Sequence, residues 1–246
     1  MFKDYFSSNS KNYAQFRPGY PEVLFKKIVA YCEGKDQVLD IGTGNGQAAV
    51  ELSKYFQQVT AIDPSEKQIK QAMAGDNIHY YVASAEKTGV ADQSIDLVTV
   101  AQAAHWFNFD AFYEEINRIL KSKGSLAIWT YQRIHFPEHL DPVINHFYTN
   151  IVGSYWPKER SHVDAGYSTI PFPMEQVERH DIPMTFDWDK QQLFGYVNTW
   201  SACQQYEKQH GESPLPLLEK ELNKHWPGDT ETIQITFPLV LIIGRK

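Results

Sequence analysis

The sequence contains little cysteine, no excess of positive charge and no long hydrophobic segment. Two of its 246 residues are cysteines, Cys32 and Cys203, and no cluster of cysteine or histidine lies near either of them in the sequence. Neither a disulfide framework nor a zinc site is therefore indicated, and we expect no bound metal. The formal net charge is -7, with acidic and basic residues interspersed. Because phosphate binding needs a basic face, we expect no nucleic-acid partner.

The sequence also lacks a segment for membrane insertion or secretion. The longest apolar run, Phe237 to Ile243, is far shorter than the roughly 20 residues of a membrane-spanning helix. The region from Met1 to Phe16 mixes charged and polar side chains with scattered aromatics, so no secretory signal is predicted. We therefore expect a soluble, cytoplasmic protein with no membrane partner.

Between residues 37 and 132 the sequence alternates short β-branched runs with amphipathic helical runs. This alternation is typical of a parallel sheet with crossover helices, so the expected fold class is doubly wound α/β. A helix with a clear apolar face is expected from Phe109 to Leu120, ending at Gly124. The expected strands of this region are 37–41, 59–62, 78–82, 95–100 and 125–130.

A glycine-rich turn, Asp-Ile-Gly-Thr-Gly-Asn-Gly, lies between the first expected strand and the next helix, with glycines at Gly42, Gly44 and Gly46. Without a Cβ, these residues let the backbone approach a ligand, and the amides at the helix start offer donors. Asp63 ends the second strand, where a carboxylate can accept both hydroxyls of a ribose. The pattern predicts a site for a nucleoside-containing ligand. The alternatives are a purely structural turn and, for Asp63, a helix cap.

The spacing of the glycines separates two kinds of nucleoside cofactor. A dinucleotide-binding fingerprint would require glycine at position 47, which is Gln47. The observed G-x-G-x-G spacing resembles the first motif of class I S-adenosylmethionine (SAM)-dependent methyltransferases. This resemblance implies SAM as cofactor and S-adenosyl-L-homocysteine as product, with the turn holding the methionine part. A nicotinamide-dependent oxidoreductase is the less favoured alternative.

Two more segments resemble the same family. The Ala-Ile-Asp-Pro-Ser segment at the end of the second strand is similar to its second motif, which implies cofactor contacts from Asp63 and Pro64. The Ala-Ser-Ala-Glu segment after the third strand is similar to the part that holds adenine, which implies contacts from Ser84, Ala85 and Glu86. Family members often carry aspartate where this chain has Ser84, so the hydroxyl takes the place of a carboxylate.

Residues 101–107 after the fourth strand and 13–21 near the N-terminus resemble a small-molecule branch of the family, the trans-aconitate-type methyltransferases. In that branch the N-terminal segment folds over the SAM pocket. The resemblance therefore implies that Tyr13 and Arg17 close the pocket and contact the SAM carboxylate; the alternative is packing and a surface ion pair. For Asp40 three roles stay open: direct or water-mediated binding of the methionine amine, or hydrogen bonds to the amides of the turn.

The resemblance also implies a seven-stranded sheet whose last strand, Phe237–Ile243, runs antiparallel to the others. Pro238 cannot donate to the ladder, so we expect it at a bulge or near the start of this strand. One domain is expected to span residues 1–246. Its parts would be an N-terminal cap (1–36), a SAM-binding core (37–132) and lid or substrate inserts (133–176 and 188–230).

The acceptor site is expected beyond the carboxyl end of the fourth strand, because open α/β sheets bind ligands at that edge. Gln102, His105 and Trp106 follow the strand, and we predict that Gln102 contacts the cofactor and Trp106 the acceptor. His105 is the candidate general base near this strand, since free histidine has a pKa of about 6.5. The alternative for His105 is a place in the pocket wall.

Three residues further along the chain are candidates for acceptor binding. Trp129 ends the fifth strand, Arg133 follows it, and Arg160 lies in the expected lid. The alternatives are core packing for Trp129 and a solvated surface charge for each arginine. An arginine can grip a carboxylate with two hydrogen bonds, and an aromatic face can attract a sulfonium. We therefore predict methyl transfer to an oxygen of a small molecule, with a carboxylic acid as candidate acceptor. The alternative from another class is a SAM-binding regulator without turnover.

Overall fold

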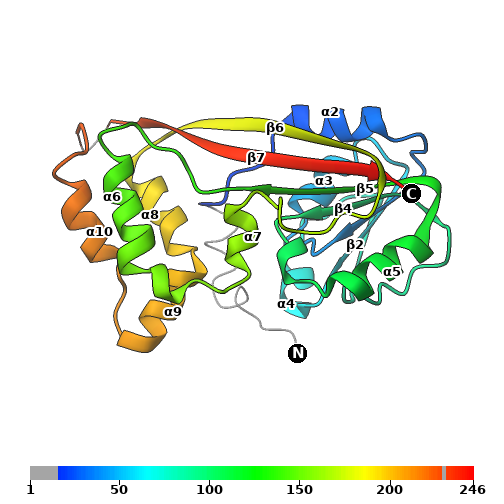
Figure 1. Cartoon of the computed structure of the whole chain (residues 1–246), viewed down its shortest axis with the longest axis horizontal. Coiled ribbons are helices and arrows are strands. Elements are labelled where there is room, and N and C mark those ends of the chain that lie inside the picture. Colours follow the sequence, from blue (N-terminus) through cyan, green and yellow to red (C-terminus); the bar gives the residue numbers. More distant parts are fainter. Residues whose placement is uncertain (1–15, 229–230) are drawn as a thin grey trace.

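The structure of the protein is a computed structural model that describes residues 16–228 and 231–246, so Tyr13 lies outside the described residues. Seven strands form one sheet in the order β3-β2-β1-β4-β5-β7-β6 (Figure 1). β1 to β5 run parallel, whereas β7 is antiparallel to both β5 and β6. The predicted doubly wound fold with an antiparallel last strand is confirmed. The bounds are Gln37–Ile41 (β1), Gln58–Asp63 (β2), Ile78–Val82 (β3), Ile95–Ala101 (β4), Leu120–Tyr131 (β5), Glu175–Trp188 (β6) and Ile233–Arg245 (β7).

Helices cover both faces of the parallel part of the sheet. Helices α2 (Glu22–Tyr31) and α3 (Gln47–Leu52) pack on one face, and α5 (Phe109–Ile119) packs on the other (Figure 1). Successive residues of β1 point to opposite faces, so Val38 joins the apolar cluster of α2 and α3 while Leu39 joins that of α5. Both side chains are fully buried, as expected for a parallel strand covered on each side.

The helices of the inserts form a group beside the sheet. β6 and β7 extend past the parallel strands toward α6, α8, α9 and α10, and α7 lies between this group and the parallel strands (Figure 1). Their bounds are Asp141–His146 (α6), Arg160–Asp164 (α7), Lys190–Asn198 (α8), Ser201–His210 (α9) and Leu215–Leu222 (α10). Within the described residues, no helix is both long enough and apolar enough to cross a membrane.

The order of the strands reverses between β1 and β4. β2 and β3 lie on one side of β1, whereas β4 and β5 lie on the other. The loops that follow β1, β2 and β4 therefore meet at one edge of the sheet although they are far apart in the sequence. This edge is where open α/β sheets bind ligands.

The predicted end of the helix before β5 is wrong. Helix α5 ends at Ile119 rather than at Gly124, because Leu120 already pairs with Ile95 of β4. The register between β4 and β5 then shifts, and Lys123 adopts a φ of 66° before regular pairing resumes. The turn at Lys123 therefore lies within the first residues of β5 and not between the helix and the strand.

The expectation for Pro238 is also wrong, because it lies in the middle of β7, opposite Pro183 of β6. Two residues earlier in β7, Thr236 exchanges backbone hydrogen bonds with His135 on the β5 side of the strand. In an antiparallel strand, the N–H and C=O groups of every second residue point to the same neighbouring strand. The nitrogen of Pro238 therefore points to the β5 side, and the regular pairing of β7 with β5 ends next to it, at Leu239. The missing donor therefore breaks no bond to β6.

Trp129 on β5 belongs to the core. Its side chain is fully buried, and its ring lies edge-on to Tyr20 and Phe25, with ring-centre separations of 5.5 and 6.2 Å. It lines neither of the two pockets described below. The predicted contact with the acceptor is wrong, because the alternation of side chains along β5 turns this ring toward α2.

We expect Trp129→Ala to lower the free energy of unfolding by about 3 to 5 kcal/mol, because it opens a large cavity in this core. Urea denaturation followed by circular dichroism measures the change. Tyr81→Ala, on the exposed face of the edge strand β3, is the control and should change stability by no more than about 0.5 kcal/mol. An equally small change for Trp129→Ala would contradict the core assignment.

Candidate active site

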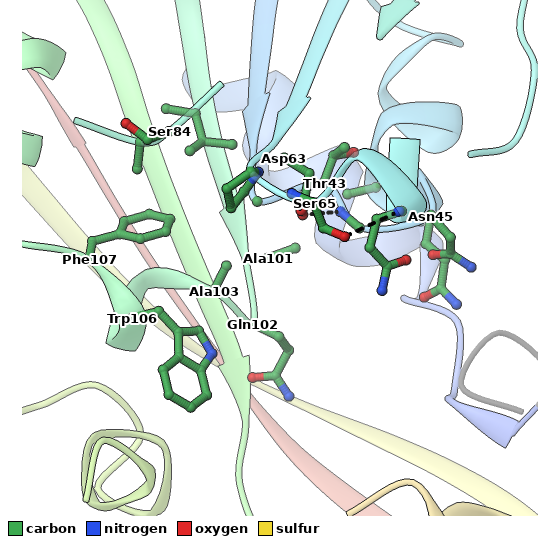
Figure 2. Close-up of a pocket in the computed structure, with 18 of the residues that line it drawn as sticks. Thr43, Asn45, Asp63, Ser65, Ser84, Ala101, Gln102, Ala103, Trp106 and Phe107 are labelled. Carbon is green, nitrogen blue, oxygen red and sulfur yellow. Dashed lines mark hydrogen bonds between the residues drawn. The ribbon is translucent and has the colours of Figure 1, made fainter. Parts of the chain in front are cut away.

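A cavity of about 720 Å³, here called the outer cavity, lies at the carboxyl ends of β1, β2 and β4. Its volume is in the range of small-molecule sites. The turn after β1, the ends of β2 and β3, and the loop after β4 all contribute side chains to it (Figure 2). The predicted cofactor residues that line it are Arg17, Gly42, Gly44, Asp63, Pro64, Ser84, Ala85, Glu86 and Gln102.

The glycines of the turn after β1 have different roles, although Gly42, Gly44 and Gly46 all have positive φ angles. A Cβ on Gly42 would lie 2.6 Å from the Cβ of Ala103, and one on Gly46 would collide with the Tyr80 hydroxyl. A Cβ on Gly44 would have no atom within 4 Å, so this is where the backbone is open to a ligand. Gly46 lies at the start of α3 and does not line the cavity, so its contact with the cofactor stays a prediction.

The Asp63 carboxylate fastens two of the loops that line the outer cavity. Its Oδ2 accepts a hydrogen bond from the Gly44 amide at 3.0 Å, and its Oδ1 accepts one from the Ser65 amide at 2.8 Å (Figure 2). Ser65 in turn caps α4 (Glu66–Lys70) by accepting from the Gln68 amide at 3.4 Å. A carboxylate has about four lone-pair positions, and these two hydrogen bonds use two of them.

Asp40 lies behind the turn and does not line the outer cavity. Its side chain is fully buried, and its Oδ1 accepts a hydrogen bond from the Thr99 hydroxyl of β4 at 2.7 Å. Burial raises the pKa of this carboxyl to about 6. Direct binding of the methionine amine is therefore not the role that this geometry supports.

The segment after β3 forms another wall of the outer cavity, together with Phe107 (Figure 2). Ser84, Ala85 and Glu86 all line this wall. Glu86 accepts a hydrogen bond from the Asn108 amide at 3.0 Å, which ties the segment to the N-terminus of α5. The hydroxyl of Ser84 and the backbone at Ala85 are thus held in place by the sheet on one side and by α5 on the other.

Gln102 lies where the outer cavity meets a second, smaller pocket. It follows β4 with a φ of 53°, a left-handed conformation that is costly for a residue with a Cβ. Its side-chain amide is fixed to β5, because Nε2 donates to the Tyr131 carbonyl at 3.3 Å and the Thr130 hydroxyl donates to Oε1. Figure 2 shows its side chain beside that of Trp106, on the same side of the cavity.

The second pocket, here called the inner pocket, has a volume of about 50 Å³. This is roughly the space of one or two water molecules or of a carboxylate group. The inner pocket shares Arg17, Gln102 and Trp106 with the outer cavity, so the two adjoin. Its other lining residues are His105, Trp156, Pro157, Arg160, Val163 and Ser201.

Aromatic and acidic neighbours hold Arg160 in the inner pocket. Its guanidinium lies 4.8 Å from the ring centre of Trp156. Its Nε donates to the Tyr148 hydroxyl at 2.9 Å and to Asp164 at 3.0 Å. These contacts engage Nε and a face of the guanidinium, so the two terminal nitrogens can donate to a ligand in the pocket.

Arg17 connects the N-terminal segment to β5 and to the inserts. Its guanidinium lies 5.1 Å from the ring centre of Tyr196 in α8. It donates to the Tyr131 hydroxyl at 2.9 Å and to the Thr199 carbonyl at 3.4 Å. Because Arg17 lines both pockets, it is placed to meet either a cofactor carboxylate or an anionic acceptor.

His105 lies in the wall of the inner pocket, in the short helix η1 (Ala104–Trp106). Its Nδ1 is 2.8 Å from the Tyr167 hydroxyl. Burial lowers the pKa of His105 to about 3, and Arg160 and His162 act in the same direction. The imidazole is therefore neutral at physiological pH and much less basic than a free histidine.

Arg133 points away from both pockets. Its guanidinium forms an ion pair with Asp141, the first residue of α6, at 3.3 Å. Arg133 lines neither the outer cavity nor the inner pocket. The predicted role in acceptor binding is wrong, because the chain leaves the sheet after β5 and this side chain pairs with an acid on the first helix of the insert.

The sequence analysis missed several lining residues. Those of the outer cavity are Tyr20, Ile41, Thr43, Asn45, Gln47, Ala48, Ser65, Gln68, Ala101, Ala103, Phe107, Asn108, Ala111 and Glu159. Trp106, which was predicted for the acceptor, lines this cavity as well. Most of the others lie within a few positions of a predicted motif and could have been found by extending it. Glu159 and, in the inner pocket, Ser201 come from the two inserts, where no motif or periodicity indicates a site.

The fold and the outer cavity together define a class of protein. The cavity joins a glycine turn after β1 to a carboxylate at the end of β2, at the point where the strand order reverses. This is the arrangement of α/β enzymes that bind a nucleoside-containing cofactor. The open backbone at Gly44 and the carboxylate of Asp63 fit a ligand with an amino-acid part and a ribose.

Comparison with known proteins identifies the family. A family model described as a methyltransferase domain matches residues 39–128. A methyltransferase of Dictyostelium discoideum is 38% identical over 252 residues, which cover 100% of this chain and 96% of the relative. The chain therefore belongs to the class I SAM-dependent methyltransferases, and its cofactor is SAM.

Two further comparisons agree with this assignment. A solved structure described as a type II methyltransferase from Anaeromyxobacter dehalogenans is 34% identical, with a TM-score of 0.86, and the match covers 94% of this chain and 98% of the other. The SAM-dependent methyltransferase CRG1 of Saccharomyces cerevisiae is 32% identical over 144 residues, which cover 54% of this chain and 50% of the relative. The nicotinamide-dependent alternative finds no support in these matches.

We expect Asp63→Ala to weaken SAM binding at least tenfold, because hydrogen bonds to a charged acceptor contribute roughly 1.5 to 3 kcal/mol each. Since the carboxylate also fastens Gly44 and Ser65, the variant should melt at a lower temperature. Titration calorimetry with SAM and a thermal melt measure the two effects. The control is Asp76→Ala, an exposed acid outside the cavity. An unchanged Kd for Asp63→Ala would show that Asp63 only ties the loops together.

Proposed function

We propose that this enzyme transfers the methyl group of SAM to a carboxylate of a small acidic molecule, as trans-aconitate-type methyltransferases do. The observation that carries the proposal is the pair of cations, Arg17 and Arg160, in the wall of the inner pocket. Two guanidinium groups around so small a space favour an anionic group that accepts several hydrogen bonds. Because the net charge of the chain is -7, this attraction is local.

We place SAM in the outer cavity. The backbone at Gly44 would face the methionine part, Asp63 the ribose hydroxyls, and Ser84 and Ala85 the adenine. Arg17 would meet the carboxylate of SAM or that of the acceptor, since it lines both pockets. This placement brings the methyl group toward Gln102 and Trp106, where the outer cavity and the inner pocket adjoin.

When bound, SAM supplies an electrophilic methyl group on a sulfonium. The residues of the chain then have to align an acceptor oxygen with that group and exclude water. Arg160 holds the acceptor carboxylate, and the indole of Trp106 and the fixed amide of Gln102 limit where it can lie. An ionised carboxylate attacks with a lone pair, so no proton has to be removed. This requirement agrees with His105, which is neutral and weakly basic.

Arg160→Lys keeps the charge but loses the planar fork, so it should raise the KM for an acidic acceptor about tenfold or more while leaving the Kd for SAM unchanged. Arg133→Lys is the matched control, because Arg133 lines neither pocket and should not affect catalysis. Steady-state kinetics measure both variants, and a thermal melt checks that Arg160→Lys is folded. If Arg133→Lys impaired the kinetics and Arg160→Lys did not, the acceptor would bind outside the inner pocket, near Arg133.

The nature of the acceptor is tested by a labelled-methyl assay across carboxylic acids, phenols and amines. We expect label in an acid, as a methyl ester that alkaline treatment cleaves. A base-stable product would exclude an ester and assign the enzyme to phenol or amine methylation. S-adenosyl-L-homocysteine formation is followed in the same reactions, and its absence with every acceptor would favour a regulator that binds SAM without turnover.

A further inference from the structure

We propose that His105 donates a hydrogen bond to the methyl acceptor through Nε2–H, in a tautomer fixed by the Tyr167 hydroxyl. Two observations carry the proposal: the contact between Nδ1 and the phenol, and the place of the imidazole in the wall of the inner pocket. The role toward the acceptor rests on the proposed function. The tautomer is a property of the protein alone and can be tested without an acceptor.

The surroundings of Tyr167 direct its proton to His105. The phenol is 1% exposed, and its oxygen lies 2.8 Å from Nδ1. Burial raises the pKa of Tyr167, so the phenol keeps its proton at physiological pH. Among the described residues, Nδ1 of His105 is the group with which this hydroxyl makes a hydrogen bond. A buried O–H without an acceptor would be costly, so the proton of the phenol points to Nδ1. A neutral imidazole that accepts at Nδ1 carries its proton on Nε2.

This tautomer gives the inner pocket a wall of hydrogen-bond donors. With Nδ1 engaged by Tyr167, Nε2 is the polar atom that His105 can present to the pocket, alongside the guanidinium groups of Arg17 and Arg160. A carboxylate has lone pairs and no protons, so it can accept from all three side chains. The N–H of an amine or the O–H of a protonated acid would face the N–H donors of the pocket wall, and polar groups on both sides would be left unpaired. His105 thereby selects the acceptor without taking a proton from it.

The charges around His105 keep its donor present throughout the physiological range. Arg17 faces it from the N-terminal segment, Arg160 and His162 from α7, and the uncharged Tyr167 from the turn after α7. Burial lowers the pKa of His105 to about 3, and Arg160 and His162 act in the same direction. The imidazole therefore does not titrate between about pH 6 and 8.5, where a free histidine would change charge.

The tautomer is measured directly by nuclear magnetic resonance on protein labelled with ¹⁵N-histidine. Two-bond ¹H–¹⁵N correlations distinguish the two neutral tautomers, and the His105 signal is the one absent from His105→Gln. We expect Nε2–H with no change between about pH 6 and 8.5. Tyr167→Phe removes the fixing hydroxyl and should give a mixture of tautomers. An Nδ1–H tautomer in the unaltered protein, or titration within this range, would overturn the proposal.

Kinetics test the role toward the acceptor. His105→Leu removes the donor and should raise the KM for the acidic acceptor about tenfold, with little change in kcat or SAM affinity, whereas His105→Gln keeps a donor and should be affected less. The control is His139→Gln, because His139 is exposed and lines neither pocket. A base at this position would instead cost about 100-fold in kcat in both variants, with activity falling toward acid pH.

The two levels of the proposal fail in different ways. If no carboxylic acid is methylated, the proposed function fails while the tautomer measurement still stands. If acids are methylated but His105→Leu lowers kcat and not affinity, the acceptor class holds and the donor role is wrong.

Discussion

The pair of hydrogen bonds that the Asp63 carboxylate accepts from Gly44 and Ser65 is the constraint on which the site depends. Parallel pairing brings the ends of β1 and β2 side by side, and the amides of Gly42 and Thr43 continue this pairing by donating to the Ile62 carbonyl. The carboxylate then joins the turn that follows β1 to the one that follows β2. One acidic side chain thus sets the shape of the turn and remains at the surface of the cavity.

The parts of the site that could be predicted from the sequence are those in which chemistry and backbone conformation are encoded within a few residues. The turn with Gly44 and the carboxylate of Asp63 belong to this kind, because each directly follows a strand whose β-branched pattern is clear. The same locality explains why the positions of the five parallel strands could be predicted, whereas the antiparallel last strand was implied by the family resemblance. Their hydrophobic periodicity reports burial on both faces of a sheet, which is a property of each segment by itself.

The errors have a common physical origin in side-chain direction and long-range partners. Trp129 and Arg133 lie at or next to the end of β5, as expected from the sequence. The pleat of β5, however, directs the Trp129 ring into the core, and Arg133 forms an ion pair with Asp141 on α6. Arg160 does reach the inner pocket, yet only the folded insert shows the rings and the acid that orient it. For His105, the residue type is visible in the sequence, whereas the burial that lowers its pKa and the contact with Tyr167 exist only in the folded chain.

The division of the site between two sources has a consequence for how such enzymes diverge. The outer cavity is built almost entirely from the loops after the parallel strands, while the inner pocket takes Trp156, Arg160 and Ser201 from the inserts. β6 and β7 carry the later insert away from the parallel strands (Figure 1). On the proposed assignment of the inner pocket to the acceptor, mutations in the inserts can exchange one acceptor for another while the cofactor loops stay unchanged. Duplicated copies of such a gene can acquire new substrates without first losing the ability to use SAM.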